Sequence, residues 1–395
     1  MKEFILNETK VKLWARTVDA HAWLEIENIT KLPFLHPEGI ALAPDAHGGS
    51  GVPIGCILPT MSAVIPNAIG NDCGCGMRAI ETNIKVGDIT SDVLRKGIMR
   101  GIRKLIPIGD IPHKEAQPEE LIPTEFGDPN ELPILGKNNG YNKIMRKQIG
   151  TLGGGNHFIE LQSDEEGFLW VMIHSGSRGV GGRLNTEYNQ IAKVLNKRYF
   201  SVVPEEAQLA FIPWKTDLFN DFWKEMGFAL AYAEKNREIM MKNCIKVIGD
   251  NLPDLVIKRE IDIHHNYAIE EEHFGQKCFV HRKGATRAGA GEIGIIPGSQ
   301  GTFSYIVEGL GSEASFMSCS HGAGRKMSRT EAVAKLDYNS EVKMMEDKGI
   351  VHAIRGRKDL EEAAGAYKDI DEVMANETDL VKPLVKLRPI AVMKG

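Results

Sequence analysis

Several features that would assign the protein to a common class are missing from its sequence. No uninterrupted apolar run approaches the roughly 18 to 20 residues that span a membrane, so we expect no membrane association. The opening residues, MKEFILNETK, carry too many charges for a secretory signal. Six cysteines in 395 residues are too few for a disulfide scaffold. These absences predict a cytoplasmic protein with reduced thiols.

Strong charge and common nucleotide-binding motifs are also missing. The net charge of −5 speaks against indiscriminate binding of nucleic acids, although an enzyme could still gather its arginines in one cleft. The sequence contains no GxxxxGKS/T motif, which disfavours a P-loop NTPase. It also lacks the CxxC and Hx3–5H pairs of a structural zinc site.

The spacing of apolar residues predicts a mixture of strands and helices. Strand-like runs with glycine or proline turns occupy about the first 85 residues and then 150–178, 261–310 and 384–393. Helical spacing or capping predicts helices over 91–105, 217–247 and 330–336, and a short helix or turn over 361–375. Residues 107–137, rich in proline and acidic residues, are expected to form a surface excursion. Histidine motifs recur from residue 47 to residue 321 without a linker, so we predict one intertwined α+β domain over 1–395.

Two of the predicted helices carry an apolar stripe. The first stripe comprises Val93, Leu94, Ile98, Ile102 and Leu105. The second helix begins after Thr216 as its N-cap, and its stripe comprises Phe219, Phe222, Trp223, Met226, Leu230, Ala233 and Met240. Aromatic residues at this spacing are more typical of core packing than of a base-stacking platform, and we interpret the stripe as core.

A histidine stands directly before a small glycine-rich loop in the segment Ser318-Cys319-Ser320-His321-Gly322-Ala323-Gly324-Arg325. Glycine lets backbone N–H groups approach a phosphate closely, and Arg325 and Arg329 could hold phosphate oxygens. Residues 328–331 form a capping box that opens a helix, whose N-terminus also favours an anion. His321 could attack phosphorus and carry it covalently, which indicates phosphoryl or nucleotidyl transfer. The alternative is a structural histidine in a tight turn.

Four separated segments offer ligands for metal ions, namely Asn71-Asp72-Cys73-Gly74-Cys75-Gly76, Gly153-Gly154-Gly155-Asn156-His157, Met172-Ile173-His174-Ser175-Gly176 and His264-His265-Asn266. A thiolate or a carboxylate can bridge two cations, whereas an imidazole binds one. One Asp, one Cys and three His therefore suit a two-metal cluster about 3.5 to 4 Å across that could clamp a phosphoryl group. Zn, Fe and Mn all fit such ligands. Taken singly, each histidine could instead bond a backbone carbonyl, and each cysteine could fill a core site.

Taken together, the motifs resemble those of RtcB-type RNA ligases, in that family's order and over nearly the whole chain. They are Pro44-Asp45-Ala46-His47, Asn71-Asp72-Cys73-Gly74-Cys75-Gly76-Met77, Gly154-Gly155-Asn156-His157-Phe158-Ile159-Glu160, His174-Ser175-Gly176-Ser177-Arg178-Gly179, His265-Asn266, Arg282-Lys283-Gly284-Ala285, Pro297-Gly298-Ser299, His321-Gly322-Ala323-Gly324-Arg325 and Lys394-Gly395. The resemblance implies a GTP- and manganese-dependent ligase. Such an enzyme joins RNA 3′-phosphate or 2′,3′-cyclic phosphate ends to 5′-hydroxyl ends.

The resemblance also implies roles for individual residues. His321 would be the nucleophile that takes GMP as a phosphoramidate. Cys75 would bridge two Mn ions, one completed by His157 and His174 and the other by Asp72 and His265. The GTP-binding residues would be Asn156 at the phosphate, Gly322, Ala323 and Gly324 in the loop, and Glu160, Ser299, Tyr367 and Lys394 around the guanine. The ligands of the RNA phosphates would be Arg178, Arg325 and Arg329.

The expected partner is therefore RNA with these ends, and the protein is expected to act as a monomer. The need for an activating partner protein stays open. A binuclear metallophosphoesterase acting on cyclic phosphate ends would need the same metals but has no use for His321, Tyr367 or Lys394. A non-enzymatic RNA-binding subunit with a vestigial site would predict lost ligands, and none is lost.

The chain departs from the family's usual pattern in three places. Asn71 and Cys73 stand where aliphatic residues are usual, and Gln300 stands where Met is common. Cys73 could compete for metal or make the site prone to oxidation. His264 competes with His265 as a ligand, and the match to the His-Asn motif favours His265. Asp45 and His47 are expected to play a supporting role near the metals.

Overall fold

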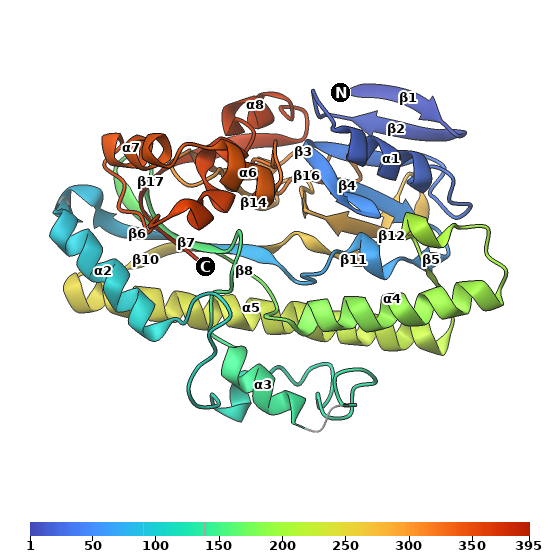
Figure 1. The fold of residues 1–395 in the computed structure, drawn as a ribbon, viewed down its shortest axis with the longest axis horizontal. Helices are drawn as coiled ribbons and strands as arrows, with labels where there is room; N and C mark the ends of the chain where they lie inside the picture. The colour runs from blue at the N-terminus through green and yellow to red at the C-terminus, as the bar shows by residue number, and fades with distance from the viewer. Residues whose placement is uncertain (90, 138–139) are drawn as a thin grey trace.

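The computed structural model describes residues 1–89, 91–137 and 140–395. Two large sheets form the body of the molecule, and long helices run along one side of it (Figure 1). This mixture of sheets and helices confirms the predicted α+β class. Within the described ranges, no helix is both long enough and apolar enough to cross a membrane.

The first large sheet has six strands in the order β1-β2-β3-β4-β12-β11. Its neighbouring strands are antiparallel except for β2 and β3, which are parallel. The strands are β1 (Lys2–Leu6), β2 (Thr9–Leu13), β3 (Ile40–Ser50), β4 (Val52–Thr60), β11 (Asn266–His273) and β12 (Gln276–Lys283).

Helix α1 (Ala20–Ile29) corrects the expectation that the first 85 or so residues form only strands and loops. Asp19 caps this helix by accepting a hydrogen bond from the backbone N–H of Ala22 at 2.9 Å. Its buried apolar face is narrow, and Leu24 is 56% exposed. The apolar spacing therefore carries only a weak helical signal.

The second large sheet has seven strands in the order β10-β6-β8-β7-β17-β15-β14, all antiparallel to their neighbours. The strands are β6 (Gly76–Lys85), β7 (Phe158–Ser163), β8 (Phe168–Ser175), β10 (Ile257–His264), β14 (Ile293–Ile296), β15 (Ser304–Gly309) and β17 (Val381–Lys394). Two small sheets pair β13 (Ala285–Arg287) with β16 (Ser318–Ser320) and β5 (Ala63–Val64) with β9 (Ile212–Pro213).

The register of the seven-stranded sheet brings distant segments to one end of its strands. Gly76, which begins β6, lies opposite both Ser175 at the end of β8 and His264 at the end of β10. Phe158, which begins β7, lies opposite Lys394 at the end of β17. Residues just outside these strand ends must therefore lie close together.

The long helix predicted over 217–247 is α5 (Asp217–Asn251), and Thr216 caps it by accepting from the backbone N–H of Phe219 at 3.1 Å. Its predicted stripe packs into the core, and α4 (Val180–Arg198) lies beside it (Figure 1). The other two helices of this part are α2 (Asp92–Leu105), after the cap Ser91, and α3 (Tyr141–Gln148). The stripe predicted for α2 is partly wrong, because Val93 is 75% exposed.

The C-terminal part contains α6 (Arg329–Lys335), α7 (Tyr338–Asp347) and α8 (Ile370–Ala375). The predicted capping box of α6 is present, with Ser328 and Glu331 each bonding the other's backbone N–H. Short 3-10 helices occupy Pro66–Ala68, Val86–Ile89, Glu119–Leu121, Glu205–Ala207, Glu313–Ser315, Arg357–Glu362 and Ala364–Ala366.

Residues 107–137 contain no strand and only one short 3-10 helix, Glu119–Leu121, as expected for an excursion. The excursion is nevertheless anchored. The backbone N–H groups of Ile134 and Leu135 both donate to the carboxylate of Glu225 on α5, each at 2.9 Å. Leu132 and Ile122 are buried in the same core cluster as α5. The excursion is therefore packed against the long helix.

Candidate active site

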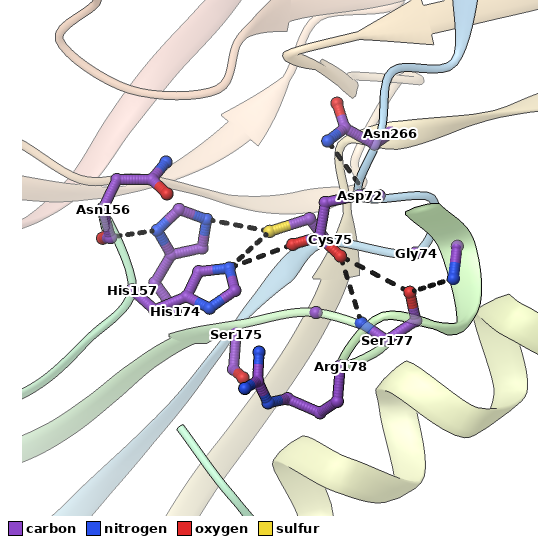
Figure 2. A network of polar contacts seen from close by, with 12 residues as sticks. Asp72, Gly74, Cys75, Asn156, His157, His174, Ser175, Ser177, Arg178 and Asn266 are labelled. Carbon is purple, nitrogen blue, oxygen red and sulfur yellow. Dashed lines mark hydrogen bonds and ion pairs between the residues drawn. The ribbon is translucent and has the colours of Figure 1, made fainter. Parts of the chain in front are cut away.

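The four predicted metal-ligand segments meet at the shared end of the strands of the seven-stranded sheet. The Cys75 Sγ atom lies 3.4 Å from His157 Nε2 and 3.2 Å from His174 Nε2 (Figure 2). His157 Nε2 lies 3.0 Å from a carboxylate oxygen of Asp72, and His174 Nε2 lies 3.3 Å from His265 Nε2. Cys75 is therefore central, with Asp72 next to His157 and His265 next to His174.

Hydrogen bonds orient two of these imidazoles. The carbonyl oxygen of Leu152 lies 3.0 Å from His157 Nδ1, and that of Asn156 lies 3.2 Å from His174 Nδ1. A carbonyl can only accept, so each Nδ1 carries a proton and each Nε2 is the ring nitrogen left for a metal ion. Both Nε2 atoms converge on the Cys75 sulfur. A cation among them would satisfy all of these atoms at once, so the residues fit a metal centre.

The electrostatics of the cluster agree with a cation site. Burial holds the pKa of His174 and His265 well below its ordinary value, which keeps both imidazoles neutral as metal ligands require. Burial opposes ionisation of Asp72, but its contact with His157 lowers the pKa of this carboxyl. Burial raises the pKa of Cys75 well above its ordinary value, and a bound cation would reverse this by stabilising the thiolate.

Cys73 lies outside this cluster. It is 5% exposed and packs with Val180 and Leu184 in the apolar core beneath the site. Burial also raises the pKa of its thiol. Among the described residues, the group of side chains that could hold a metal ion includes Cys75 but not Cys73. Cys73 is therefore a residue of the apolar core.

His264 also points away from the cluster. Its Nδ1 lies 3.1 Å from the carbonyl oxygen of Gly74, and it lines a separate hollow beside α5. His265 instead contacts His174, and its own Nδ1 is buried without a hydrogen-bond partner. The geometry thus agrees with the choice of His265 as the ligand.

His321 lies just after β16, with its ring next to that of His265 at a centroid separation of 5.0 Å. Asp45 is fully buried, and one of its carboxylate oxygens lies 2.6 Å from His321 Nδ1 and 3.1 Å from the His321 backbone nitrogen. Gly324 permits this approach, because its φ is +70° and a side chain there would clash with the Asp45 carbonyl. Asp45 therefore orients His321 rather than the metal ligands, and Nε2 of His321 is left as the free nitrogen.

A cavity of about 250 Å³ connects His321 with the metal-ligand cluster. The predicted site residues that line it are Asp72, Cys75, Asn156, His174, His265, Ser299, His321, Gly322, Ala323, Gly324, Arg325, Arg329, Tyr367 and Lys394. Three predicted residues do not line it: His157, which lies just behind Cys75, and Glu160 and Arg178.

Glu362 organises the cationic wall of the cavity. Its carboxylate accepts hydrogen bonds from Arg325 at 3.0 Å, from Arg329 at 2.8 Å and from the Tyr367 hydroxyl. Arg325 also stacks over the Tyr367 ring, 5.0 Å from its centroid. Nothing in the sequence distinguishes Glu362, because it is one of several charged residues in its segment and belongs to no motif. One carboxylate thus holds both arginines at the cavity.

Lys394 projects from the end of β17 toward the cavity. Its ammonium lies 3.5 Å from the Asn156 carbonyl and 5.1 Å from the centre of the Phe158 ring. Glu160 on β7 lies behind it, where burial raises the carboxyl pKa to about 7, although Lys394 and a hydrogen bond from Gln162 act against this. The Glu160 carboxyl and the Lys394 ammonium therefore lie near each other at this end of the site.

Two hydrogen bonds hold the Arg178 side chain beside the cluster. Its Nε donates to the Thr151 hydroxyl at 3.0 Å and its Nη2 donates to the Gly109 carbonyl at 3.2 Å. Figure 2 shows Arg178 following Ser177, whose backbone N–H donates to Asp72 at 3.3 Å. Arg178 and Arg329 flank the same glycine loop, since a side chain at Gly153 would lie 2.4 Å from the Arg178 guanidinium and one at Gly155 would lie 2.7 Å from that of Arg329.

The comparisons with known proteins cover almost the whole chain. The family model described as tRNA-splicing ligase RtcB matches residues 25–395. The chain belongs to the RtcB family. The RNA-splicing ligase RtcB of Escherichia coli K12 is 37% identical over 98% of this chain and 97% of its own length. The tRNA-splicing ligase RtcB of Pyrobaculum aerophilum is 31% identical over 93% and 90%, respectively.

Relatives outside bacteria and archaea carry the same family name. The RNA-splicing ligase RtcB homolog 2 of Entamoeba dispar is 33% identical over 89% of this chain and 80% of its own length. The predicted resemblance to RtcB-type ligases is therefore confirmed. Both the family model and the Escherichia coli relative match this chain over nearly its whole length. The convergence of the motifs on one cavity gives this membership a physical basis.

Proposed function

We propose that this RtcB protein is an RNA ligase that joins RNA 3′-phosphate or 2′,3′-cyclic phosphate ends to 5′-hydroxyl ends. The proposed reaction uses GTP and two Mn ions and proceeds through GMP carried on His321. The observation that carries the proposal is that His321, the metal-ligand cluster and Lys394 share one cavity. The printed names of the relatives, RNA-splicing and tRNA-splicing ligase, support RNA as the substrate. A cytoplasmic location belongs to the same proposal.

The first step is the transfer of GMP to His321. Its Nε2 attacks the α-phosphorus of GTP, so that a P–N bond forms and the bond to pyrophosphate breaks. Asp45 holds the proton on Nδ1, which keeps the lone pair on Nε2 and stabilises the positive charge that the ring acquires. The short contact between Asp45 and His321 supports this role.

The next steps move GMP onto RNA and then seal the strand. An oxygen of the RNA 3′-phosphate attacks the same phosphorus, the P–N bond breaks, and His321 is regenerated. The 5′-hydroxyl then loses its proton and attacks the RNA 3′-phosphorus, so that GMP leaves and a phosphodiester forms. A cyclic phosphate end must first be opened by water, because only the opened end has a free 3′-phosphate to accept GMP.

The residues proposed to hold the two Mn ions are Asp72, Cys75, His157, His174 and His265. When bound, the ions would offset the negative charge that develops on the phosphoryl oxygens. The carbonyl partners of His157 and His174 support this arrangement, since they keep the ligating nitrogens aimed at Cys75. The division of the ligands between the two ions stays a prediction.

The remaining walls suit the nucleotide and the RNA backbone. The Glu160 carboxylate can accept from the N1–H and amino group of guanine, and the Lys394 ammonium can donate to its O6. The other residues proposed to contact GTP are Asn156, Ser299, Gly322, Ala323, Gly324 and Tyr367. Arg178, Arg325 and Arg329 are proposed to bind RNA phosphates, which requires no reading of base sequence.

Covalent labelling tests the proposal directly. The protein is incubated with α-labelled GTP and Mn²⁺, denatured and separated on a gel, in parallel with the His321→Ala variant. We expect label on the parent protein and none on the variant. A parent protein that stays unlabelled, yet binds metal and hydrolyses cyclic phosphate ends, would contradict ligation and favour the metallophosphoesterase.

A further inference from the structure

Two adjacent side chains on α5, Asn236 and Arg237, are fully buried behind the metal-ligand cluster. Neither contributes a ligand atom to the cluster. Buried amides and guanidiniums are costly unless they are hydrogen-bonded, so their partners indicate what they hold in place. Those partners lie in three of the metal-ligand segments and in the residues just before the fourth, the His157 segment.

Arg237 joins the segment of Cys75 to the segments of His174 and His265. Its Nη1 donates to the carbonyl of Gly74 at 3.0 Å and to that of Ser175 at 3.2 Å. Its Nε donates to the carboxylate of Asp262 at 3.0 Å, and Nη2 bonds the other oxygen of the same carboxylate. The planar guanidinium thus links the residues next to two ligands with the strand that leads into the third.

The close packing of the cysteine loop depends on the same helix. Gly74 has a φ of +83°, and a side chain there would lie 2.9 Å from the backbone oxygen of Ala229. A side chain at Gly76 would meet the Arg237 guanidinium at 2.9 Å. Both residues that flank Cys75 are therefore seated on α5.

Asn236 joins the residues just before the His157 segment to the His174 segment. Its side-chain oxygen accepts from the backbone N–H of Gly150 at 2.7 Å and of Thr151 at 3.1 Å. Its amide nitrogen donates to the Thr151 carbonyl, the Ser175 hydroxyl and the Gly176 carbonyl at 3.0 to 3.2 Å. The amide therefore fixes both loops with one side chain.

This network reaches His157 through one further bond. The Ser175 hydroxyl, which Asn236 holds, donates to the Leu152 carbonyl at 2.7 Å. The same carbonyl orients His157 through Nδ1 at 3.0 Å. A shift of Asn236 would thus move the group that aims a ligating nitrogen.

We infer that Asn236 and Arg237 are positioning residues of the metal centre, which set the relative places of its four ligand segments from the long helix. The inference rests on the proposed metal site and goes beyond it by assigning a role to residues that touch no ligand atom of the metal. Partners that orient metal ligands typically change affinity by about 10- to 100-fold when they are replaced.

The test measures metal binding without RNA or GTP. The metal-free protein is titrated with Co²⁺, and the thiolate-to-cobalt absorption band reports binding at Cys75. Arg237→Lys keeps the charge but loses the paired bonds to Asp262, and Asn236→Asp keeps the shape but loses the amide donor. We expect each variant to weaken Co²⁺ binding by at least about 10-fold and to alter the band.

Two matched variants separate positioning from general loss of stability. Glu225→Gln changes another fully buried polar side chain of α5, whose partners are Tyr188 and the backbone N–H groups of Ile134 and Leu135 rather than any metal-ligand segment. Asn196→Asp changes another buried amide, which bonds only the backbone of Phe211. Both should bind Co²⁺ within about twofold of the parent protein, whatever their melting temperatures.

A milder variant guards against unfolding. Asp262→Asn keeps a hydrogen-bond acceptor for Arg237 and should weaken Co²⁺ binding in the same direction if the more severe variants do not fold. Unchanged affinity and an unchanged band in folded Arg237→Lys, Asn236→Asp or Asp262→Asn proteins would overturn the inference and leave the proposed function intact. A parent protein that binds no Co²⁺ would overturn the metal site itself, and the inference with it.

Discussion

The two halves of the active site are built in different ways. The metal-ligand half stands at the ends of paired strands, and Cys75, His157, His174 and His265 are each at most 5% exposed. The phosphate half depends on ion pairs to Glu362, and the Arg329 side chain is 54% exposed. The first half is therefore held by backbone ladders and buried hydrogen bonds, whereas the second is held by charge.

This difference suits the two tasks. A metal centre needs its ligand atoms within a few tenths of an ångström of one geometry, which buried strand ends can provide. In the proposed function an RNA phosphate would arrive as a new anion and compete with Glu362 for Arg325 and Arg329. The predictions below separate the rigid half from the adjustable one, from the largest expected effect to the smallest.

Replacing the central thiol should have the largest effect on the metal-ligand half. Cys75→Ala removes the atom on which two imidazoles converge, and we expect Co²⁺ affinity to fall by at least about 100-fold. Cys73→Ala is the matched control, because its thiol packs in the core. An equal loss of affinity in both variants, measured by titration, would show that the two thiols share the metal.

Asp45→Asn should impair His321 without affecting the metal centre. An amide can present its NH2 group to Nδ1, which favours the wrong tautomer and no longer stabilises a charged ring. We expect the rate of GMP labelling to fall on the order of 100-fold while Co²⁺ affinity stays within about twofold. Asp379→Asn, which changes a carboxylate bonded to Trp14, serves as the control. A labelling rate equal to that of the parent would exclude this role for Asp45.

Arg329→Gln should weaken the phosphate half by a smaller amount. Loss of one guanidinium should raise the KM for RNA by about 5- to 10-fold and reduce the slope of log affinity against log salt by about 1. Lys335→Gln removes a cation from the same helix that pairs only with Glu331, and it should change neither quantity. Equal effects of both substitutions would indicate long-range charge rather than contact.

The last prediction concerns folding stability rather than substrate or metal binding, and it involves Glu377, which lies beneath His321. Glu377 is fully buried, accepts from the Ser320 backbone N–H at 2.9 Å, and burial raises its pKa to about 8. The unfolded chain loses this proton near pH 4.5 and the folded protein only near pH 8, so stability falls as pH rises between these values.

Glu377→Gln removes this titration while keeping an acceptor for Ser320. The free energy of unfolding of the variant, relative to the parent protein, should therefore rise by on the order of 4 kcal/mol from pH 4.5 to pH 8.5. Denaturant titrations at both pH values check this. A constant difference between the two proteins would mean that Glu377 is ionised in the folded state at neutral pH.

Short-range signals were sufficient for much of the architecture. The cap at Thr216 and the stripe of the long helix predicted α5, and residues 328–331 predicted the start of α6. These features depend on residues three or four positions apart, which interact in any context. They failed where tertiary contacts overruled the pattern: Val93 fits a helical stripe but faces solvent, and α1 buries too narrow a face to be recognised.

The sequence by itself determined which residues could form the site, because thiol, imidazole, carboxylate and glycine-rich loop are properties of residue types and their neighbours. Only the tertiary structure decided how they are used. It points the Cys75 thiol toward the histidines and buries the Cys73 thiol in the core, and it places the Asp45 carboxylate against His321. It also seated the ligand segments on Asn236 and Arg237. These choices depend on sheet register and helix packing between residues far apart in the chain, where no local spacing carries information.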